Sequence, residues 1–237
     1  MSNILLLMMG GIGSRFGADI PKQFIEVKGK PIYAYIINAY DKSEVVDKMV
    51  VVCNPDWFEY ASNQINVLNL NKPIKLVKGG KTRSTSVKNG VMSLRSIAKE
   101  EDYVLIHDAT HPYLDVEAVK KALDMMTDYD GVTICQNEYD TCYNIDGPNI
   151  ISEIPKTKVV SGASPEIFRY GDVLNMCTKP PEESIEKMTS IGALALENGL
   201  RIGAVPTSIL NIKITLPEDL VLFTELCSSY YFRSDFL

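Results

Sequence analysis

A cluster of glycines and cations follows the first apolar run of the chain. Residues 4–9 are apolar and predict a buried strand, which ends in a glycine-rich turn that contains Gly10, Gly11 and Gly13. Backbone N–H groups that are open where a strand turns into a helix bind phosphate oxygens well. Arg15 and Lys22 add a planar donor fork and a mobile point charge to the same short segment. These residue types at this spacing predict a triphosphate site.

The spacing of this loop differs from both common phosphate-binding fingerprints. The Walker sequence G-x-x-x-x-G-K-[ST] is not present, and Phe16 stands where a Rossmann loop needs its third glycine. Taken alone, the glycines are equally compatible with an ordinary strand-to-helix turn whose charges are solvated. The Pro21-Lys22-Gln23 sequence that follows favours the phosphate site.

Four motifs, in this order, resemble those of the cytidylyltransferases that act on methylerythritol phosphate, ribitol phosphate and glycerol phosphate. They lie at residues 10–16 with 21–23, at 79–87, at 106–109 with Pro112, and at 211–215 with 217–220. The resemblance spans almost the whole chain. It implies an α/β fold, specifically a Rossmann-like nucleotidyltransferase sandwich with a mostly parallel central sheet and a protruding β-hairpin arm. One domain is expected over residues 1–237.

The resemblance also implies roles for individual residues in CMP transfer from CTP. Arg15 and Lys22 would hold the triphosphate, and Lys213 would stabilise charge at the α-phosphate. Mg²⁺ would bridge the phosphate oxygens, with Asp108 as its protein ligand. The nucleotide-binding set would be Gly10, Gly11, Gly13, Gly79, Gly80, Arg83, Ser86, Asp108 and Ala109.

Each of these roles has a simpler structural alternative. Lys213 alternates with apolar neighbours in a predicted strand, so it could be a solvated lysine on the polar face that it shares with Asn211. Asp108 could cap the following turn instead of contacting ribose or metal. Ser86 could simply cap a helix, and Arg83 could be a solvated side chain on it, without contact to the nucleotide.

Departures from the family pattern concern the acceptor. The family sequence H-D-A-x-R-P reads H-D-A-T-H-P here, so His111 replaces an arginine and one permanent positive charge is lost. Q-T-P-Q reads A-S-P-E at residues 163–166, which leaves Ser164 in the acceptor-binding set. T-D-[DE]-x-S keeps only Thr189, and the arginine of the arm corresponds to Lys156. A phosphate clamp of Lys156 and Thr189 survives these changes, whereas the groups that read the polyol are altered.

We therefore predict a polyol phosphate acceptor, either glycerol phosphate or ribitol 5-phosphate, and a CDP-polyol product for surface polysaccharide such as capsule or teichoic acid. One alternative is a 2-C-methyl-D-erythritol 4-phosphate cytidylyltransferase of isoprenoid synthesis. Another is a catalytically silent nucleotide-binding protein. A sugar-1-phosphate nucleotidyltransferase that uses UTP or dTTP is a further alternative, although the glycine loop of that class is longer.

Strand and helix signals alternate along the chain. Apolar and β-branched runs predict strands at 4–9, 48–53, 74–77, 103–106, 131–135, 201–205 and 209–214. Helical spacing and capping residues predict helices at 32–39, 57–67, 83–97, 116–126, 165–176, 184–198 and from Pro217 onward. This order predicts a largely parallel sheet covered on both faces. The phosphate-site motifs then fall at the carboxyl ends of strands, where such sheets bind ligands.

Residues 137–160 interrupt this alternation. Two strands at 140–145 and 150–154, separated by an Asp-Gly-Pro-Asn turn, predict a β-hairpin. In the resembled family this arm embraces a second subunit, so we expect a homodimer. An arm folded onto its own domain is the alternative.

Composition excludes several classes of protein. The net charge of −6 argues against a nucleic-acid surface, and no apolar run is long enough to span a membrane. Without a leader-like segment the chain is expected in the cytoplasm. The five cysteines show no C-x-x-C spacing and only two histidines accompany them, so reduced thiols are expected rather than a zinc site.

Overall fold

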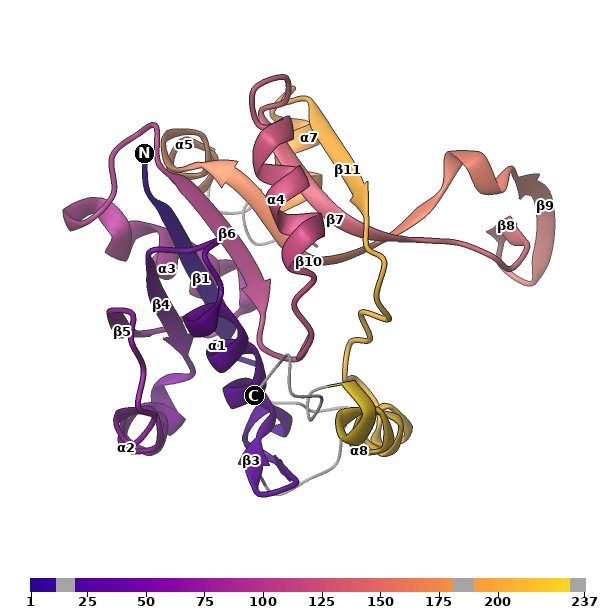
Figure 1. Ribbon diagram of the computed structural model, residues 1–237. Coiled ribbons are helices and arrows are strands. Elements are labelled where there is room, and N and C mark those ends of the chain that lie inside the picture. Colours follow the sequence, from indigo (N-terminus) through magenta and orange to yellow (C-terminus); the bar gives the residue numbers. More distant parts are fainter. Residues whose placement is uncertain (12–19, 181–189, 231–237) are drawn as a thin grey trace.

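The computed structural model describes residues 1–11, 20–180 and 190–230, without the side chains of 228–230. Within these residues, seven strands form one twisted sheet in the order β11-β7-β10-β6-β1-β4-β5 (Figure 1). β10 alone among them runs antiparallel to its neighbours, β6 and β7. The strand bounds are β1 (Asn3–Met9), β4 (Lys48–Cys53), β5 (Ile74–Lys78), β6 (Tyr103–Asp108), β7 (Gly131–Asn137), β10 (Val160–Arg169) and β11 (Ile202–Pro206). The predicted mostly parallel α/β sheet is confirmed.

Helices cover both faces of this sheet. The helix bounds are α1 (Ile32–Lys42), α2 (Phe58–Asn66), α3 (Arg83–Ser93), α4 (Val116–Met125), α5 (Tyr170–Thr178), α7 (Ile191–Glu197) and α8 (Pro217–Tyr230). Successive residues of β1 enter opposite cores: Leu5 packs with α1, α2 and α4, and Leu6 packs with α3, α5 and α7. This alternation explains why an uninterrupted apolar run forms the central strand. α8 packs in a third, smaller cluster with Tyr35 and Tyr113.

Short elements complete the described chain. They are the two-residue strands β2 (Glu26–Val27) and β3 (Lys30–Pro31), and the 3₁₀ turns Lys22–Phe24, Pro55–Trp57, Leu94–Ser96 and Lys156–Lys158. Gly199 follows α7 with φ +75°, as expected for the glycine that ends a helix. The part of the predicted 184–198 helix that precedes Ser190 lies outside the described residues.

The predicted hairpin is present as β8 (Cys142–Asp146) and β9 (Asn149–Ile154), paired antiparallel. Gly147 in its turn has φ +55°, which glycine adopts without steric cost. Figure 1 shows the hairpin at the end of two long extensions from β7 and β10, well away from the sheet. The arm is therefore a projecting element within one chain.

Two predicted elements are wrong. Residues 165–176 were expected to be helical, but β10 continues to Arg169 and α5 begins at Tyr170. Ile167 and Phe168 are buried on opposite faces of the sheet, so a central strand uses this apolar pair better than a helix would. Residues 209–214 were expected to be a strand but have no regular structure, because side-chain hydrogen bonds rather than a neighbouring strand hold them.

Candidate active site

A cavity of about 370 Å³ lies at the carboxyl ends of β1, β4 and β6. Its lining comes from the glycine loop, the start of α3, the end of β6 and the segment before α8. The residues that line it are Met8, Met9, Gly10, Gly11, Lys22, Gln23, Asn54, Lys81, Thr82, Arg83, Ser86, Asp108, Ala109, Thr110, Lys213 and Thr215. Residues of all four sequence motifs therefore meet at one edge of the sheet.

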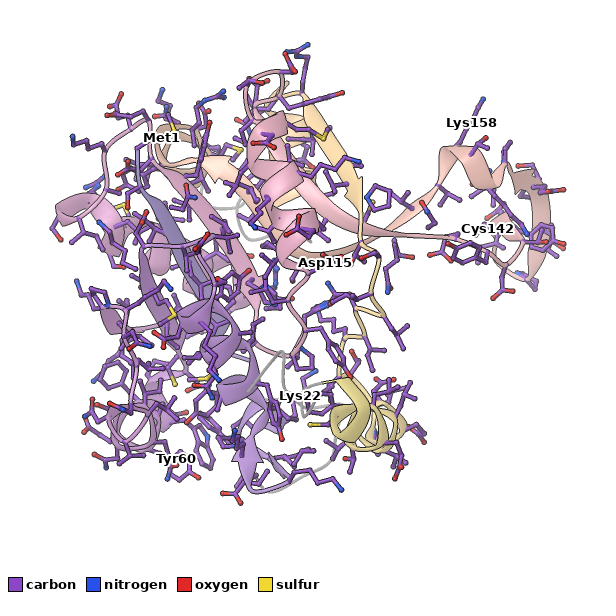
Figure 2. All side chains as sticks on the ribbon, viewed as in Figure 1. Met1, Lys22, Tyr60, Asp115, Cys142 and Lys158 are labelled. Atoms are coloured by element: carbon purple, nitrogen blue, oxygen red, sulfur yellow. The ribbon has the colours of Figure 1, made fainter. Side chains whose placement is uncertain are left out.

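Gln23 fixes the glycine loop from inside. Its buried side-chain amide donates to the carbonyl oxygens of Met9 at 3.1 Å and Gly11 at 2.8 Å. Lys22, beside it, donates from Nζ to the carbonyl of Ile214 at 2.6 Å, which joins this loop to the segment before α8. Figure 2 shows Lys22 between the sheet and α8. Gln23 belonged to the motif, but its anchoring role was not anticipated.

The start of α3 is held by Ser86. Its hydroxyl accepts from the N–H of Gly80 at 3.0 Å and donates to the carbonyl of Thr82 at 2.8 Å. A Cβ at Gly79 would lie 2.8 Å from Ser86 Oγ, and one at Gly80 would lie 2.2 Å from Thr85 Oγ1. Both glycines thus allow the loop to close onto the helix. They do not line the cavity, whereas Ser86 and Arg83 do.

Asp108 stands between two cations. Its carboxylate pairs with Arg83 Nη2 at 3.3 Å and with Lys213 Nζ at 2.7 Å. Burial acts to raise the pKa of Asp108, but the Arg83 guanidinium and the Lys213 ammonium outweigh it and hold that pKa well below its usual range. The carboxylate is therefore ionised at neutral pH, and the three side chains carry a net charge of about +1 together.

A second cavity of about 700 Å³ adjoins the first. Arg83, Asp108 and Lys213 line both cavities and form their common border. The other residues of the second cavity are Ile106, His111, Thr133, Gln136, Val160, Gly162, Ala163, Ser164, Glu166, Ser190, Gly192, Ala193, Leu196, Ile202, Asn211 and Ile212. The predicted acceptor residues His111 and Ser164 are both in this set, so the sites expected for nucleotide and acceptor share one charged edge.

Buried hydrogen bonds position these two residues. The Nδ1–H of His111 donates to Asn211 Oδ1 at 3.0 Å, and the amide of Asn211 donates to the carbonyl of Ser164 at 3.1 Å. Burial lowers the pKa of His111, so its ring is neutral near pH 7 and leaves Nε2 as a hydrogen-bond acceptor. His107, fully buried, donates from Nε2 to the carbonyl of His111 at 2.8 Å and accepts from the Tyr40 hydroxyl at 3.0 Å.

Asn211 and Lys213 were predicted to share one polar face of a strand, and this prediction is wrong. Asn211 is 3% exposed and lies inside, whereas Lys213 is exposed at the cavity border. The difference arises because the segment is not a strand and its side chains need not alternate. Asn211 belongs to the fourth motif, but its partner His111 is 100 residues away in the sequence, so spacing gave no signal for this contact.

Lys156 lies apart from this site. It is on the arm, where its Nζ donates to the carbonyl of Tyr139 at 2.5 Å, and it lines neither cavity. Figure 2 shows Lys158, in the same short turn, at the far end of the arm from Lys22. Arg15, Gly13 and Thr189 lie outside the described residues.

The described part of the chain contains no group of three or more His, Cys, Asp or Glu side chains that could hold a metal ion. Asp108 therefore supplies one carboxylate, without a further cluster of metal-binding side chains around it in residues 1–11, 20–180 and 190–230. Cys53, Cys135, Cys177 and Cys227 are buried thiols, and Cys142 on the arm is half-buried. None of the helices in residues 1–11, 20–180 and 190–230 has the length and apolar character that crossing a membrane requires.

Sequence comparisons connect this geometry to known enzymes. The chain is 31% identical over 232 residues to the ribitol-5-phosphate cytidylyltransferase of Streptococcus agalactiae serotype V, with 95% of each chain covered. It is 32% identical over 222 residues to the 2-C-methyl-D-erythritol 4-phosphate cytidylyltransferase of Clostridium botulinum strain 657, with 93% of this chain and 95% of that one covered.

Structural comparison gives the same fold. The crystal structure of 4-diphosphocytidyl-2C-methyl-D-erythritol synthase from Anaerococcus prevotii superposes with a TM-score of 0.80 at 20% identity, covering 96% of this chain and 98% of that one. The model of the IspD family, described as 2-C-methyl-D-erythritol 4-phosphate cytidylyltransferase, matches residues 4–227. The chain is thus a member of this cytidylyltransferase family.

Proposed function

We propose that this chain transfers CMP from CTP to a polyol phosphate, either ribitol 5-phosphate or glycerol phosphate, and releases pyrophosphate. The observation that carries the proposal is the common border of the two cavities, where Arg83, Asp108 and Lys213 lie between a nucleotide-sized site and a second, larger one. Two substrates bound on either side of this border would place their phosphates next to one another.

The reaction requires little proton chemistry. A phosphate oxygen of the acceptor attacks the α-phosphorus of CTP, the bond to the β-phosphate bridge breaks, and pyrophosphate leaves with its electron pair. Two anions must approach, so catalysis depends on positioning and on cations. Lys213 and Arg83 at the border, and Lys22 beside the glycine loop, supply that charge. Arg15 is proposed to add to it.

Magnesium fits this arrangement in a limited way. Mg²⁺ binds through one or two carboxylates together with substrate phosphates, and Asp108 offers one ionised carboxylate within the nucleotide cavity. When bound, the ion would neutralise phosphate charge. Because Asp108 also pairs with Arg83 and Lys213, the nucleotide would provide most of the remaining ligands.

The lining of the acceptor cavity favours a polyol phosphate other than methylerythritol phosphate. His111, which replaces the arginine of the resembled pattern, is neutral and tied to Asn211, so the cavity lacks a permanent cation at that position. Relatives of both kinds exist, since one is named a ribitol-5-phosphate cytidylyltransferase and another a methylerythritol phosphate enzyme. The second activity is the competing proposal. A silent nucleotide-binding protein is disfavoured by the retained Lys22 and Lys213.

We also propose that the arm joins two copies of the chain. Ile145, Ile150 and Ile151 are 71%, 64% and 61% exposed on the hairpin, and a two-stranded hairpin is marginally stable alone in water. A second subunit would cover these side chains. It would also give Lys156 a route to the partner's acceptor cavity, which it does not reach within its own chain.

The test is pyrophosphate release with CTP and Mg²⁺ against methylerythritol 4-phosphate, ribitol 5-phosphate, glycerol 2-phosphate and glycerol 3-phosphate. Turnover with a polyol phosphate, but not with UTP or dTTP in place of CTP, supports the proposal. A clear preference for methylerythritol phosphate overturns the acceptor assignment. CTP binding without turnover on any of the four acceptors overturns the acceptor assignment and favours, first, an acceptor outside this panel and, second, the silent nucleotide-binding protein.

A further inference from the structure

The acceptor cavity contains a carboxylate, the last residue of the altered 163–166 motif, to which neither the sequence analysis nor the proposed reaction gives a function. Glu166 lies on β10, opposite Ile106 of β6 and opposite Thr133 of β7. Its side chain lines the cavity together with His111 and Ser164. It lies in the middle of the sheet, beside Ile106, which precedes the border residue Asp108 by two positions on β6.

The carboxylate of Glu166 is fixed by the backbone at the start of α7. Its Oε1 accepts from the N–H of Gly192 at 2.7 Å, and a Cβ on Gly192 would lie 2.8 Å from the same oxygen. A larger residue at position 192 would require this carboxylate to shift. Among the described residues, no nitrogen of a lysine, arginine or histidine lies within the 4.0 Å ion-pair distance of Glu166. A carboxylate has about four acceptor positions, so backbone contacts leave some of them to a ligand.

Because the Glu166 carboxylate is buried, it is costly to leave its hydrogen-bond acceptor positions without a donor. It raises the pKa of Glu166, against the opposing effect of the Gly192 N–H and the more distant Arg83. A carboxylate in such surroundings is stabilised by further hydrogen-bond donors. The neutral ring of His111 offers one more acceptor atom in the same cavity. A ligand that matches this lining must present several hydroxyl donors.

The position of Glu166 also sets a length for that ligand. Glu166 pairs with Ile106, and Asp108 is two residues further along the same strand, a separation of about 7 Å at roughly 3.3 Å per residue. Asp108 lies on the border where the acceptor phosphate must react. A hydroxyl bound by Glu166 therefore belongs to the end of the acceptor that is remote from its phosphate. Glycerol phosphate ends two carbons earlier than ribitol phosphate.

We propose that Glu166 is a specificity-determining residue that binds the distal hydroxyl groups of the acceptor and selects a linear five-carbon polyol phosphate over a three-carbon one. This inference rests on the proposed cytidylyltransferase reaction. It assigns to Glu166 the discrimination between the two acceptor lengths that the proposed function leaves open.

The experiment compares the wild type with Glu166→Gln in steady-state pyrophosphate release, using ribitol 5-phosphate, glycerol 3-phosphate and CTP as varied substrates. The amide still accepts from Gly192, so α7 keeps its contact, but the charged acceptor is lost. We expect KM for ribitol 5-phosphate to rise about tenfold, with KM for CTP and for glycerol 3-phosphate changed less than about twofold. Glu197→Gln, an exposed change at the other end of α7, serves as control and should match the wild type.

The ratio of kcat/KM for the two polyol phosphates is the deciding measurement, because a structural role would lower both values equally. An unchanged ratio in Glu166→Gln overturns the inference while wild-type turnover leaves the proposed function standing. A wild type that transfers CMP to neither polyol phosphate overturns the proposed function itself, and the role of Glu166 with it. The melting temperature of each variant shows that its fold is retained.

Discussion

Replacing Asn211 by alanine should weaken both the fold and the reaction. Asn211 is 3% exposed, and its amide joins His111 to Ser164 through hydrogen bonds of 3.0 and 3.1 Å. Both partners are themselves buried, at 5% and 7% exposure, so water has little access to replace the lost contacts. Each orphaned group costs about 1–2 kcal/mol. We expect the free energy of unfolding to fall by about 3 kcal/mol.

The same substitution should affect catalysis through Lys213. Asn211 is the buried anchor of a segment without regular structure, and Lys213 is two residues further along it at the cavity border. A displacement of about 1 Å at a reacting group can cost about 100-fold in rate. We expect kcat to fall about 10-fold to 100-fold in the proposed reaction, while CTP binding changes less.

Urea unfolding followed by circular dichroism gives the stability, and pyrophosphate release gives kcat. Asn198→Ala is the matched control, since that amide makes one hydrogen bond of 2.8 Å to the carbonyl of Leu194 at an exposed helix end. Its cost should stay below about 1 kcal/mol. A loss in Asn211→Ala no larger than in this control would refute the reasoning, because the buried bridge would then contribute nothing beyond a surface contact.

The remaining predictions concern charge, pH and assembly. Lys213→Ala or Lys22→Ala should lower kcat about 100-fold with about 1–2 kcal/mol lost in urea unfolding, and a loss of activity no larger than the loss of folding accounts for would contradict the catalytic assignment. Burial lowers the pKa of His107 from 6.5 to about 3, so below pH 6.5 only the unfolded chain gains this proton. Its contribution to stability should drop by about 2 kcal/mol between pH 7 and pH 5, which comparison with His107→Gln in urea at both pH values would measure. Ile150→Asp with Ile151→Asp should convert a dimer to monomers in analytical ultracentrifugation without changing the melting temperature of the domain, and a persistent dimer would exclude the arm.

Local sequence predicted those elements whose burial follows directly from the residue pattern along the chain. Residues 4–9 form a strand covered on both faces, so a continuous apolar run describes their environment completely. Ile167 and Phe168 are likewise buried on both faces of the sheet, but the residues that follow them have helical spacing, so the strand at this position was predicted as a helix. That segment is a strand because it pairs with β6 and β7, which lie far from it in the sequence. The irregular path of residues 209–214 is likewise fixed by distant side chains.

Residues of compact motifs could be predicted from the sequence, whereas residues that act through contacts between distant elements could not. Lys22, Ser86, Asp108 and Lys213 were predicted because they belong to compact motifs, and the structure gathers all four around one cavity. Glu166 belongs to the altered motif at residues 163–166, but no role was assigned to it, because its proposed role depends on Gly192, which approaches it from another element. A residue that acts through a contact formed only on folding leaves no local pattern.

Asp108 explains how cations can be ready at the border before any substrate binds. Two positive side chains close together repel each other and would turn to solvent, whereas a shared carboxylate holds Lys213 at 2.7 Å and Arg83 at 3.3 Å. The group keeps a net positive charge, so it still attracts phosphate, and Lys22 adds another cation on the nucleotide side. In the proposed reaction, incoming phosphates find donors already in position and the protein need not reorganise as charge develops. The carboxylate thus contributes to binding of anions because it orders their cationic partners.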